Sequence, residues 1–150
     1  DWHLIALVQR VSKCHVHCDG YPPRKIGKGM SVFLGIEKSD TKKDIKYIVQ
    51  KLLKLRIFDD EDGKMNLSVS DIGGDIMIIS QFTLCADTQK GNRPSYINAM
   101  RADHAQIPYT DFINHLKSLH SSVKTGFFQK DMEVEISNNG PVTLTIRSAS

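Results

Sequence analysis

The residues best placed to do chemistry stand at the end of an apolar run over positions 75–84. Ser80, Gln81 and Thr83 supply three polar side chains within four residues, in the order SQFT. A hydroxyl becomes a useful nucleophile when a neighbouring base accepts its proton. No histidine or carboxylate lies within three residues of Ser80 or Thr83. These side chains could instead end a strand and cap the next loop, so the spacing alone predicts only a polar site.

The distant histidines are the remaining candidates for such a base. His104, His115 and His120 all follow the polar stretch in the chain. Nothing in their spacing selects one of them, so the question of a partner stays open.

A basic loop follows the polar stretch. Lys90 and Arg93 lie among glycine, asparagine and proline over positions 89–95. Loops of this composition are usually only solvated. Beside a polar strand end, however, two cations could bind phosphate groups. The pair of features is typical of a polar site next to a phosphate-binding loop.

A metal site is suggested by Cys14, His15, His17 and Cys18, but the spacing argues against it. Zinc requires four ligands that converge in a tetrahedron. On a strand, alternate side chains point to opposite faces, which separates the two cysteines from the two histidines. Bringing them together would require a broken strand or ligands from elsewhere in the chain. The acidic run 59–63 does not match the calcium-loop register and indicates a turn. We expect no metal and no cofactor.

Length and charge narrow the class of protein. The chain has 150 residues, a net charge of +3 and three cysteines. This length fits one domain with a substantial core, and a mildly basic charge permits a nucleic-acid partner without requiring one. Apolar runs are far shorter than the roughly 18 residues of a membrane span, and the start is unlike a signal peptide. We therefore expect no membrane association and a reducing, cytoplasmic location.

Hydrophobic periodicity indicates the elements that must position the site. Strands are expected over 4–11, 13–19, 31–36 and 75–84. A helix over about 42–55, capped by Ser39 or Asp40, carries apolar residues at helical spacing, and a second helix spans the region from Tyr109 to Leu119. Two further strands are expected over 132–136 and 142–146. Strands with segregated helices predict an α+β domain with a largely antiparallel sheet.

The break between those last two strands has an unusual composition. Asn138, Asn139 and Gly140 favour a turn, but Pro141 then begins a strand-like run. Proline has no amide hydrogen to donate to a sheet, so it is a poor first residue for a returning strand. This position requires an explanation beyond a simple hairpin.

The pair SQFT (80–83) and NNGPVT (138–143) resembles the two signature motifs of the D-aminoacyl-tRNA deacylase (D-tyrosyl-tRNA(Tyr) deacylase) family. The resemblance covers nearly the whole chain as a single domain, with residues 1–3 as an extension before the usual start. Asn139 departs from the pattern, because aspartate is common there. Further matching blocks follow in the family's order: 8–11 (VQRV), 55–58 (LRIF), 63–68 (GKMNLS), 90–95 (KGNRPS) and 125–128 (TGFF).

The resemblance implies a homodimer of barrel-like α+β domains that hydrolyses the ester of D-aminoacyl-tRNA, and also of Gly-tRNA mischarged on tRNA(Ala). Gly140 and Pro141 would form a cis peptide that enters the partner subunit's site. Their rigid backbone would reject an L-amino acid, whose side chain would collide with it, while glycine would pass. The partners implied are D-aminoacyl-tRNA and a second copy of the chain.

The resemblance also implies a role for each site residue. The catalytic stretch would act through backbone amides of Gln81 and Phe82 and through the 2′-hydroxyl of the RNA, with Thr83 in a positioning role. The implied sets are Ser80, Gln81, Phe82 and Thr83 for catalysis; Gly140 and Pro141 as chirality filter; Arg10, Asn138 and Thr143 as its support; Phe128 and Met132 around the terminal adenine; and Lys90 and Arg93 on tRNA phosphates.

Two other interpretations make different predictions. A non-catalytic RNA- or DNA-binding module would explain the basic loop and would bind without turnover. A metal protein built on residues 14–18 would bind zinc stoichiometrically. For Phe128 and Met132, a role in the strand core remains an alternative to adenine binding.

Overall fold

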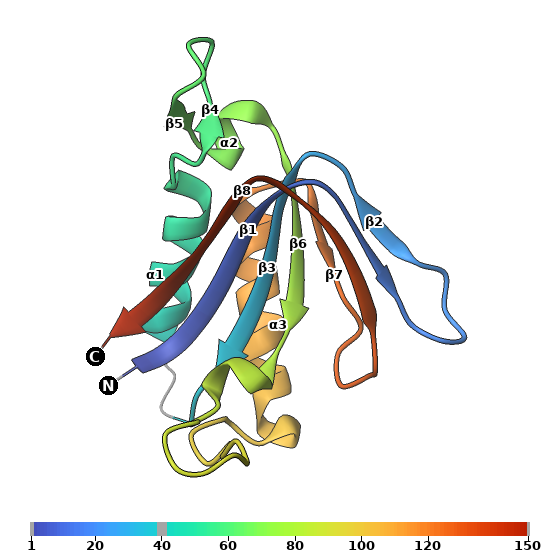
Figure 1. Ribbon diagram of the computed structural model, residues 1–150, viewed down its shortest axis with the longest axis vertical. Helices are drawn as coiled ribbons and strands as arrows, with labels where there is room; N and C mark the ends of the chain where they lie inside the picture. Colours follow the sequence, from blue (N-terminus) through green and yellow to red (C-terminus); the bar gives the residue numbers. More distant parts are fainter. Residues whose placement is uncertain (1, 39–41, 150) are drawn as a thin grey trace.

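The computed structural model describes residues 2–38 and 42–149 (Figure 1). The proposed caps Ser39 and Asp40 lie outside these residues. The elements in chain order are β1 (Trp2–His17), β2 (Arg24–Ile26), β3 (Gly29–Ile36), α1 (Lys42–Lys54), β4 (Phe58–Asp59), β5 (Met65–Leu67), α2 (Val69–Ile72), β6 (Asp75–Ser80), the 3-10 helix η1 (Phe82–Cys85), α3 (Ala102–Leu119), β7 (Val123–Thr125) and β8 (Glu133–Ala149).

The main sheet is mixed rather than largely antiparallel. Its order is β2-β1-β3-β6-β7, and β8 pairs with β1. β1 is antiparallel to β2, β3 and β8, whereas β6 is parallel to β3 and β7. The prediction is therefore right for the half around β1 and wrong for the half around β6. Parallel pairs need long crossover connections, and here α1 and α3 lie in those connections.

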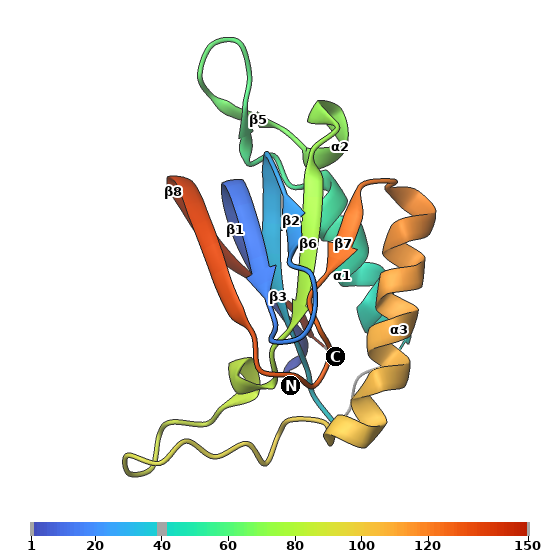
Figure 2. The same ribbon diagram turned by 90° about the vertical axis from the view of Figure 1, so that its right-hand side faces the viewer.

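The sheet curls into a nearly closed barrel (Figure 2). Arg24 on β2 reaches across to the end of β7, where its Nη1 donates to the carbonyl oxygens of Thr125 at 3.2 Å and Gly126 at 2.9 Å. Lys124 Nζ donates to the carbonyl oxygen of Lys25 at 2.8 Å. Side chains thus join β2 and β7.

Two breaks between strands that the sequence led us to expect are absent from β1 and β8. Residues 4–11 and 13–19 were expected as separate strands, but β1 runs continuously from Trp2 to His17. β8 likewise continues through the Gly-Pro position, so no turn separates 132–136 from 142–146. Asn138 pairs with Val11 and Thr143 with Gln9, which leaves three extra residues on β8 between these pairs. The unusual composition therefore marks a bulge, which accommodates extra residues and a proline within a paired strand.

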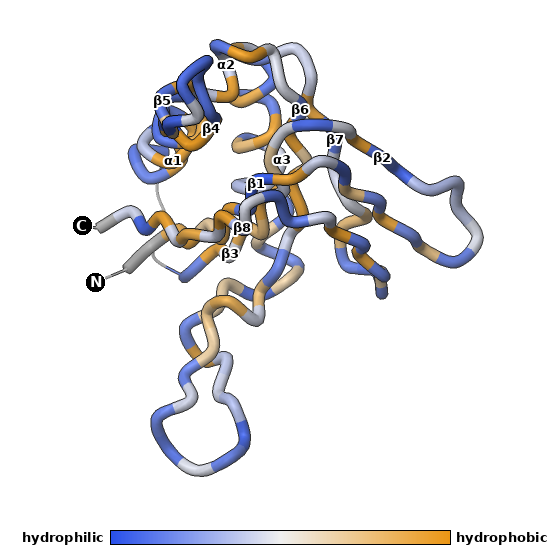
Figure 3. Tube along the Cα trace, turned by 45° about the horizontal axis from the view of Figure 1, so that its top comes forward, coloured by the Kyte–Doolittle hydropathy of each residue, from blue (hydrophilic) through white to orange (hydrophobic). Residues whose placement is uncertain are grey.

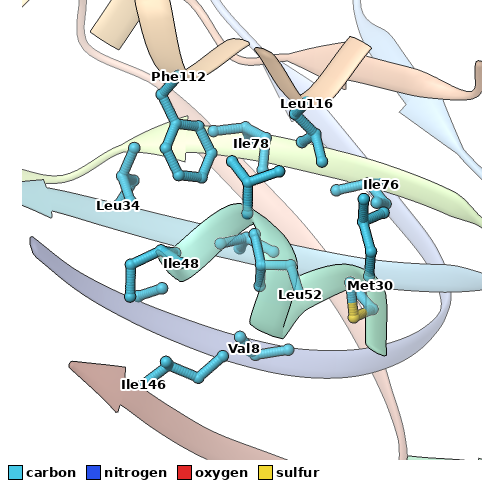
Figure 4. Close-up of a cluster of buried hydrophobic side chains, with 14 of the residues drawn as sticks. Val8, Met30, Leu34, Ile48, Leu52, Ile76, Ile78, Phe112, Leu116 and Ile146 are labelled. Atoms are coloured by element: carbon cyan, nitrogen blue, oxygen red, sulfur yellow. The ribbon is translucent and has the colours of Figure 1, made fainter. Parts of the chain in front are cut away.

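α1 and α3 cover one face of the sheet and bury the main core (Figures 1 and 2). The predicted apolar spacing of both helices is confirmed, except that Leu119 at the end of α3 is 50% exposed. Burying one such side chain contributes about 1.5–3 kcal/mol, so this interface holds the helices on the sheet. Figure 4 shows its centre: Val8, Met30, Leu34, Ile48, Leu52, Ile76, Ile78, Phe112, Leu116 and Ile146.

The expected strand 75–84 ends earlier than its apolar pattern suggests. β6 stops at Ser80, and η1 occupies Phe82–Cys85. The loop from η1 to α3 then extends from the body as a mainly hydrophilic arm (Figure 3). Within the described residues, no helix combines the length and apolar character needed to cross a membrane.

Candidate functional site

A groove of about 900 Å³ opens where β6 ends. Four segments meet there: the end of β6 with the start of η1, the end of the hydrophilic arm, the start of α3, and the connection from β7 to β8. Ser80, Gln81, Phe82, Phe128 and Met132 all line it. The fold therefore brings three of the four predicted catalytic residues and the predicted adenine pocket into one cavity, although almost fifty residues separate them in the chain.

The start of η1 determines which amides face a ligand. The Gln81 amide donates to the carbonyl oxygen of Leu34 at 2.8 Å. The Gln81 amide is thus already paired within the chain, and its donation to a substrate stays a prediction. The first amides of a helix have no acceptor within that helix. In η1 these belong to Phe82 and Thr83, which makes them the better donors.

Thr83 contacts its neighbour rather than a base. Its Oγ1 accepts a short hydrogen bond from Nε2 of Gln81, and its side chain is half-buried. Thr83 does not line the groove, whereas Ser80 and Gln81 do. The hydroxyl thus holds the Gln81 side chain at the edge of the site.

The apolar part of the groove rests on the core. The Phe128 ring stacks on Tyr109 with 4.9 Å between centroids. Burial raises the pKa of Tyr109 to about 12, so its hydroxyl stays protonated and donates to the carbonyl oxygen of Ile78 at 3.4 Å. Met132 Sδ accepts from the Phe127 amide at 3.1 Å. Phe128 and Met132 therefore both pack against the core and line the cavity, so their two interpretations are compatible.

The groove also contains residues that the sequence did not single out. Tyr96, Arg101, Lys130 and Asp131 line it, and Tyr96 packs edge-on against Phe82 at 5.1 Å between centroids. Among the described lining residues, Asp131 supplies the one carboxylate. The sequence feature that could have identified Asp131 is its position next to Met132.

The distant histidines are not part of this groove. His104, His115 and His120 are absent from its lining, and His120 Nε2 lies 2.7 Å from the carbonyl oxygen of Gly74, before β6 begins.

The β8 bulge is held by the three residues predicted to support it. Arg10 is buried, and its Nε donates to the carbonyl oxygen of Asn139 at 3.2 Å. Its Nη1 donates to the carbonyl oxygen of Ile57 at 2.9 Å and to Asp59 Oδ1 at 3.2 Å. Thr143 Oγ1 accepts from Asn138 Nδ2 at 2.8 Å. These hydrogen bonds thus connect the bulge to β1 and β4, and one further bond joins the residues on its two sides.

Gly140 has no room for a side chain at this bulge. Its φ is +121°, a region that favours glycine, and an added Cβ would lie 2.9 Å from Arg10 Nη2. The Gly140–Pro141 peptide bond is cis, as the family resemblance implies.

Within one chain, the bulge and the groove lie at opposite ends of the sheet. Asn138 pairs with Val11, Val11 with Gly29, and Gly29 with Asp75, the first residue of β6. Ser80 is the last residue of β6. At a rise of about 3.3 Å per residue, the two motifs are roughly 16 Å apart along the strand direction. A single chain does not combine them in one site.

Lys90 and Arg93 lie in the hydrophilic arm, away from the groove. Both are exposed, and the arm is closed below them by paired backbone hydrogen bonds between Asp87 and Ser95, at 2.7 and 2.9 Å. Neither lines the groove.

The structure separates the cysteines from the histidines of residues 14–18, as the strand alternation predicts. Cys14 is fully buried, and burial raises the pKa of its thiol to about 11. His15 and His17 face the other side, where they gather with Glu135 of β8 so that potential ligand atoms lie within 4.8 Å of one another. His17 Nε2 is 2.9 Å from Glu135 Oε1, which forms an ion pair when the histidine is protonated. The acidic run 59–63 forms a turn in which Asp60 Oδ1 accepts from the amides of Asp62 and Lys64.

Comparison with protein families gives a match over nearly the whole chain. Residues 7–147 match the family described as D-Tyr-tRNA(Tyr) deacylase. A protein of Thermodesulfovibrio yellowstonii named D-aminoacyl-tRNA deacylase is 48% identical over 145 residues, covering 97% of this chain and 99% of that protein. One of Clostridium botulinum with the same name is 51% identical over 143 residues, covering 95% and 96%.

Two solved structures have the same fold. The c-Myc DNA unwinding element binding protein superposes with a TM-score of 0.92 at 39% identity, covering 97% of this chain and 99% of the other. A probable eukaryotic D-amino acid tRNA deacylase superposes with a TM-score of 0.84 at 16% identity, over the same shares, and supports the fold alone.

Proposed function

The chain belongs to the D-Tyr-tRNA(Tyr) deacylase family, and on that premise we propose that its groove cleaves the ester between a D-amino acid and the terminal ribose of tRNA. It is a hydrolase of ester bonds, as its relatives are named. The observation that carries the proposal is that Ser80, Gln81 and Phe82 share one groove with Phe128 and Met132. We also propose a cytoplasmic location, where charged tRNA is used.

The groove supplies a surface for each part of the substrate. The terminal adenine would lie against Phe128 and Met132, because aromatic side chains stack on bases. The ester carbonyl would then face the start of η1. The amide of Phe82, which lines the groove, would donate to the developing oxyanion, which a fixed donor stabilises without reorganisation. The 2′-hydroxyl of the substrate would assist in place of an acid-base pair.

The remaining part of the site would come from a second copy of the chain. Gly140 and Pro141 lie too far from Ser80 to act on the same substrate within one chain. A two-fold dimer would place the bulge of each chain in the groove of the other. Arg10, Asn138 and Thr143 would keep that bulge rigid through the hydrogen bonds described above.

The rigid backbone at Gly140 and Pro141, here called the wedge, would make the site selective by steric exclusion. Gly140 presents no side chain, so its backbone could approach the substrate α-carbon closely. An L-amino acid would direct its side chain into the wedge, whereas a D-amino acid would direct it toward solvent. Glycine has no side chain to collide, so Gly-tRNA mischarged on tRNA(Ala) would also be cleaved. Lys90 and Arg93 would contact tRNA phosphates from the hydrophilic arm.

The deciding experiment compares D-Tyr-tRNA, L-Tyr-tRNA and Gly-tRNA(Ala) as substrates of the purified protein. We expect rapid deacylation of the first and third and little of the second. Equal rates on the two tyrosyl substrates would contradict the steric filter, and no turnover of any substrate would contradict the proposed activity.

A second candidate is nucleic-acid binding without chemistry. It is favoured by the 0.92 TM-score to a protein named for binding a DNA unwinding element. Such a role predicts tight binding of RNA or DNA with no turnover of D-Tyr-tRNA. Deacylation of D-Tyr-tRNA by the purified protein would therefore contradict it.

A further inference from the structure

A basic hollow lies on the edge of the barrel where β2 meets β7. Its volume is about 590 Å³, and Arg24, Lys25, Lys117 and Lys124 line it. We call these four residues the β2–β7 seam. All four are exposed, and no salt bridge pairs any of them with a carboxylate within residues 2–38 and 42–149. The seam thus presents positive charge that the described chain does not neutralise by direct pairing.

Asp75 is a carboxylate close enough to Lys124 to interact with it electrostatically. Asp75 accepts a short hydrogen bond from the Ser122 hydroxyl and another from the Gly27 amide at 2.9 Å. The Ser122 bond, with smaller contributions from the Gly27 amide and nearby Lys124, holds the pKa of Asp75 below its ordinary value. Asp75 therefore stays ionised and interacts with Lys124 electrostatically, but the two side chains form no direct ion pair in the described residues.

Arg24 is held in position without its charge being cancelled. Its Nη1 donates to carbonyl oxygens of Thr125 and Gly126, and its Cζ lies 4.0 Å from the centroid of the Phe127 ring. These partners are neutral, and its Nε and Nη2 have no recorded acceptor in the part of the chain that the structure describes. A planar cation fixed in this way keeps donors for a phosphate at little entropic cost.

Aromatic rings connect the seam to the groove. Phe127 contacts Tyr21 at 5.2 Å between centroids, and Lys130 Nζ lies 5.3 Å from the centroid of Tyr21. Lys130 itself lines the groove beside Phe128. Lys124 and Phe128 are four residues apart, so their Cα atoms are separated by at most about 14 Å. Phe127 itself is only 5% exposed, so the ring that a base could reach between the groove and the seam is Tyr21, which is 47% exposed. The exposed cations Lys130 and Arg24 lie against these two rings.

We propose that this path binds the single-stranded 3′ end of the tRNA, with nucleotides preceding the terminal adenosine running over Tyr21 and their phosphates contacting the β2–β7 seam. The inference rests on the proposed function, because it begins at the adenine pocket. Alternating aromatic and basic side chains are the arrangement that single-stranded nucleic acid uses, through stacking and phosphate contacts. Continuity with the groove favours this occupant over a membrane surface or an acidic protein.

The test combines a seam variant with a matched control. The seam variant carries Lys25→Ala, Lys117→Ala and Lys124→Ala. It leaves Arg24 in place because Arg24 makes three of the hydrogen bonds that join β2 to the end of β7, whereas Lys124 makes one. The control carries Lys43→Ala, Lys46→Ala and Lys54→Ala on the exposed face of α1, with the same change in net charge. All six lysines are exposed, so both variants should fold.

Three measurements distinguish the outcomes. Affinity for tRNA should fall at least tenfold in the seam variant, and its salt dependence should flatten by about 2 in log-log slope, because each phosphate contact on a single strand contributes about 0.7. A short single-stranded RNA with the 3′-end sequence should show the same loss. Hydrolysis of D-tyrosyl-adenosine, which has no phosphate, should stay at the wild-type rate. The control variant should match the wild type throughout.

Each contrary result has a separate meaning. Equal tRNA affinity and slope in the two variants would overturn the path. Loss of D-tyrosyl-adenosine hydrolysis would show that the seam acts on the pocket rather than on RNA, and would also overturn it. If the wild type cleaves neither ester, the proposed function fails, whereas tRNA binding still reports on the seam. Tyr21→Ala should weaken binding of the short RNA and Tyr21→Phe should restore it, because the ring supplies the contact.

Discussion

At the scale of single residues, the described lining of the groove contains polar groups but no histidine that could activate a nucleophile. Thr83 Oγ1 accepts from the Gln81 side chain, and the amides at the start of η1 are directed by the backbone. Side-chain changes should therefore affect catalysis less than changes to the backbone at Phe82. This expectation separates amide catalysis from covalent catalysis by Thr83.

We expect Thr83→Ala to retain most activity. The change removes one neutral hydrogen bond, worth about 1 kcal/mol, which corresponds to about fivefold in rate. Thr83→Ser keeps the hydroxyl and should behave as the wild type. Single-turnover deacylation of D-Tyr-tRNA measures the effect. A loss of a thousandfold or more, with an aminoacyl ester trapped on Thr83 of the wild type, would show that Thr83 is the nucleophile.

Cys14 and Cys18 should differ in reactivity toward iodoacetamide. Only the thiolate form of a cysteine reacts. Burial raises the pKa of the Cys14 thiol from 9.0 to about 11, whereas Cys18 is partly exposed. The folded protein keeps the Cys14 proton where the unfolded chain would lose it, so the free energy of unfolding should decrease as the pH rises between these values. Mass spectrometry of native protein at pH 8 should find Cys18 modified first. Equal labelling of both would mean that Cys14 is not buried in solution.

At the scale of elements, Arg10 joins the β8 bulge to β4 and to the end of the α1–β4 connection. It is 8% exposed and donates to Asn139, Ile57 and Asp59. A bulge with three extra residues has fewer ladder bonds than a regular strand, so these side-chain bonds replace them. The rigidity that a steric filter requires would come from this network.

Arg10→Ala should therefore lower the free energy of unfolding by about 2 kcal/mol or more, because buried acceptors lose a charged donor. Urea denaturation gives the value. Arg101→Ala is the control, since the Arg101–Asp103 pair is exposed and should contribute less than about 1 kcal/mol. In the folded fraction, Arg10→Ala should also cleave L-Tyr-tRNA faster relative to D-Tyr-tRNA. Unchanged stability and selectivity would mean that the bulge is held by other contacts.

At the scale of the whole molecule, the site is incomplete in one chain. The groove opens at the end of β6 and the bulge lies level with its beginning. Elements at opposite ends of one sheet can meet only in a second copy turned end to end. A two-fold axis would make two such sites at once.

Mixed dimers test this arrangement directly. Gly140→Ala would place a methyl group against Arg10 and disturb the bulge, and Ala102→Trp would fill the groove from an exposed position. Each variant alone should be inactive. A mixed dimer has one undisturbed groove facing one undisturbed bulge, so it should show about half of the wild-type rate per dimer. Inactivity of the purified mixed dimer, or elution of the wild type as a monomer, would rule out the shared site.

Much of the local structure follows from the sequence alone. The helical spacing of Ile45 to Leu53 and of Tyr109 to Leu116 identified both long helices, because one apolar stripe per helix must be buried. Strand alternation placed Cys14 and His15 on opposite faces. The motifs around Ser80 and Gly140 indicated the family, since their residue types and order are read directly from the chain.

The tertiary structure decided what depends on contacts between distant segments. Pro141 and its neighbours resemble a turn locally, but pairing of β8 with β1 on both sides makes them a bulge. The apolar run continues past Ser80 and resembles a strand there. The pairing of β6 with β3 ends at Ser80, however, and the chain then forms η1. The convergence of Ser80 with Phe128, the pairing of the Gln81 amide with Leu34, and the alignment of Tyr21, Arg24 and Phe127 arise from strand register. Register is set by the packing of the whole sheet, which periodicity along one segment does not specify.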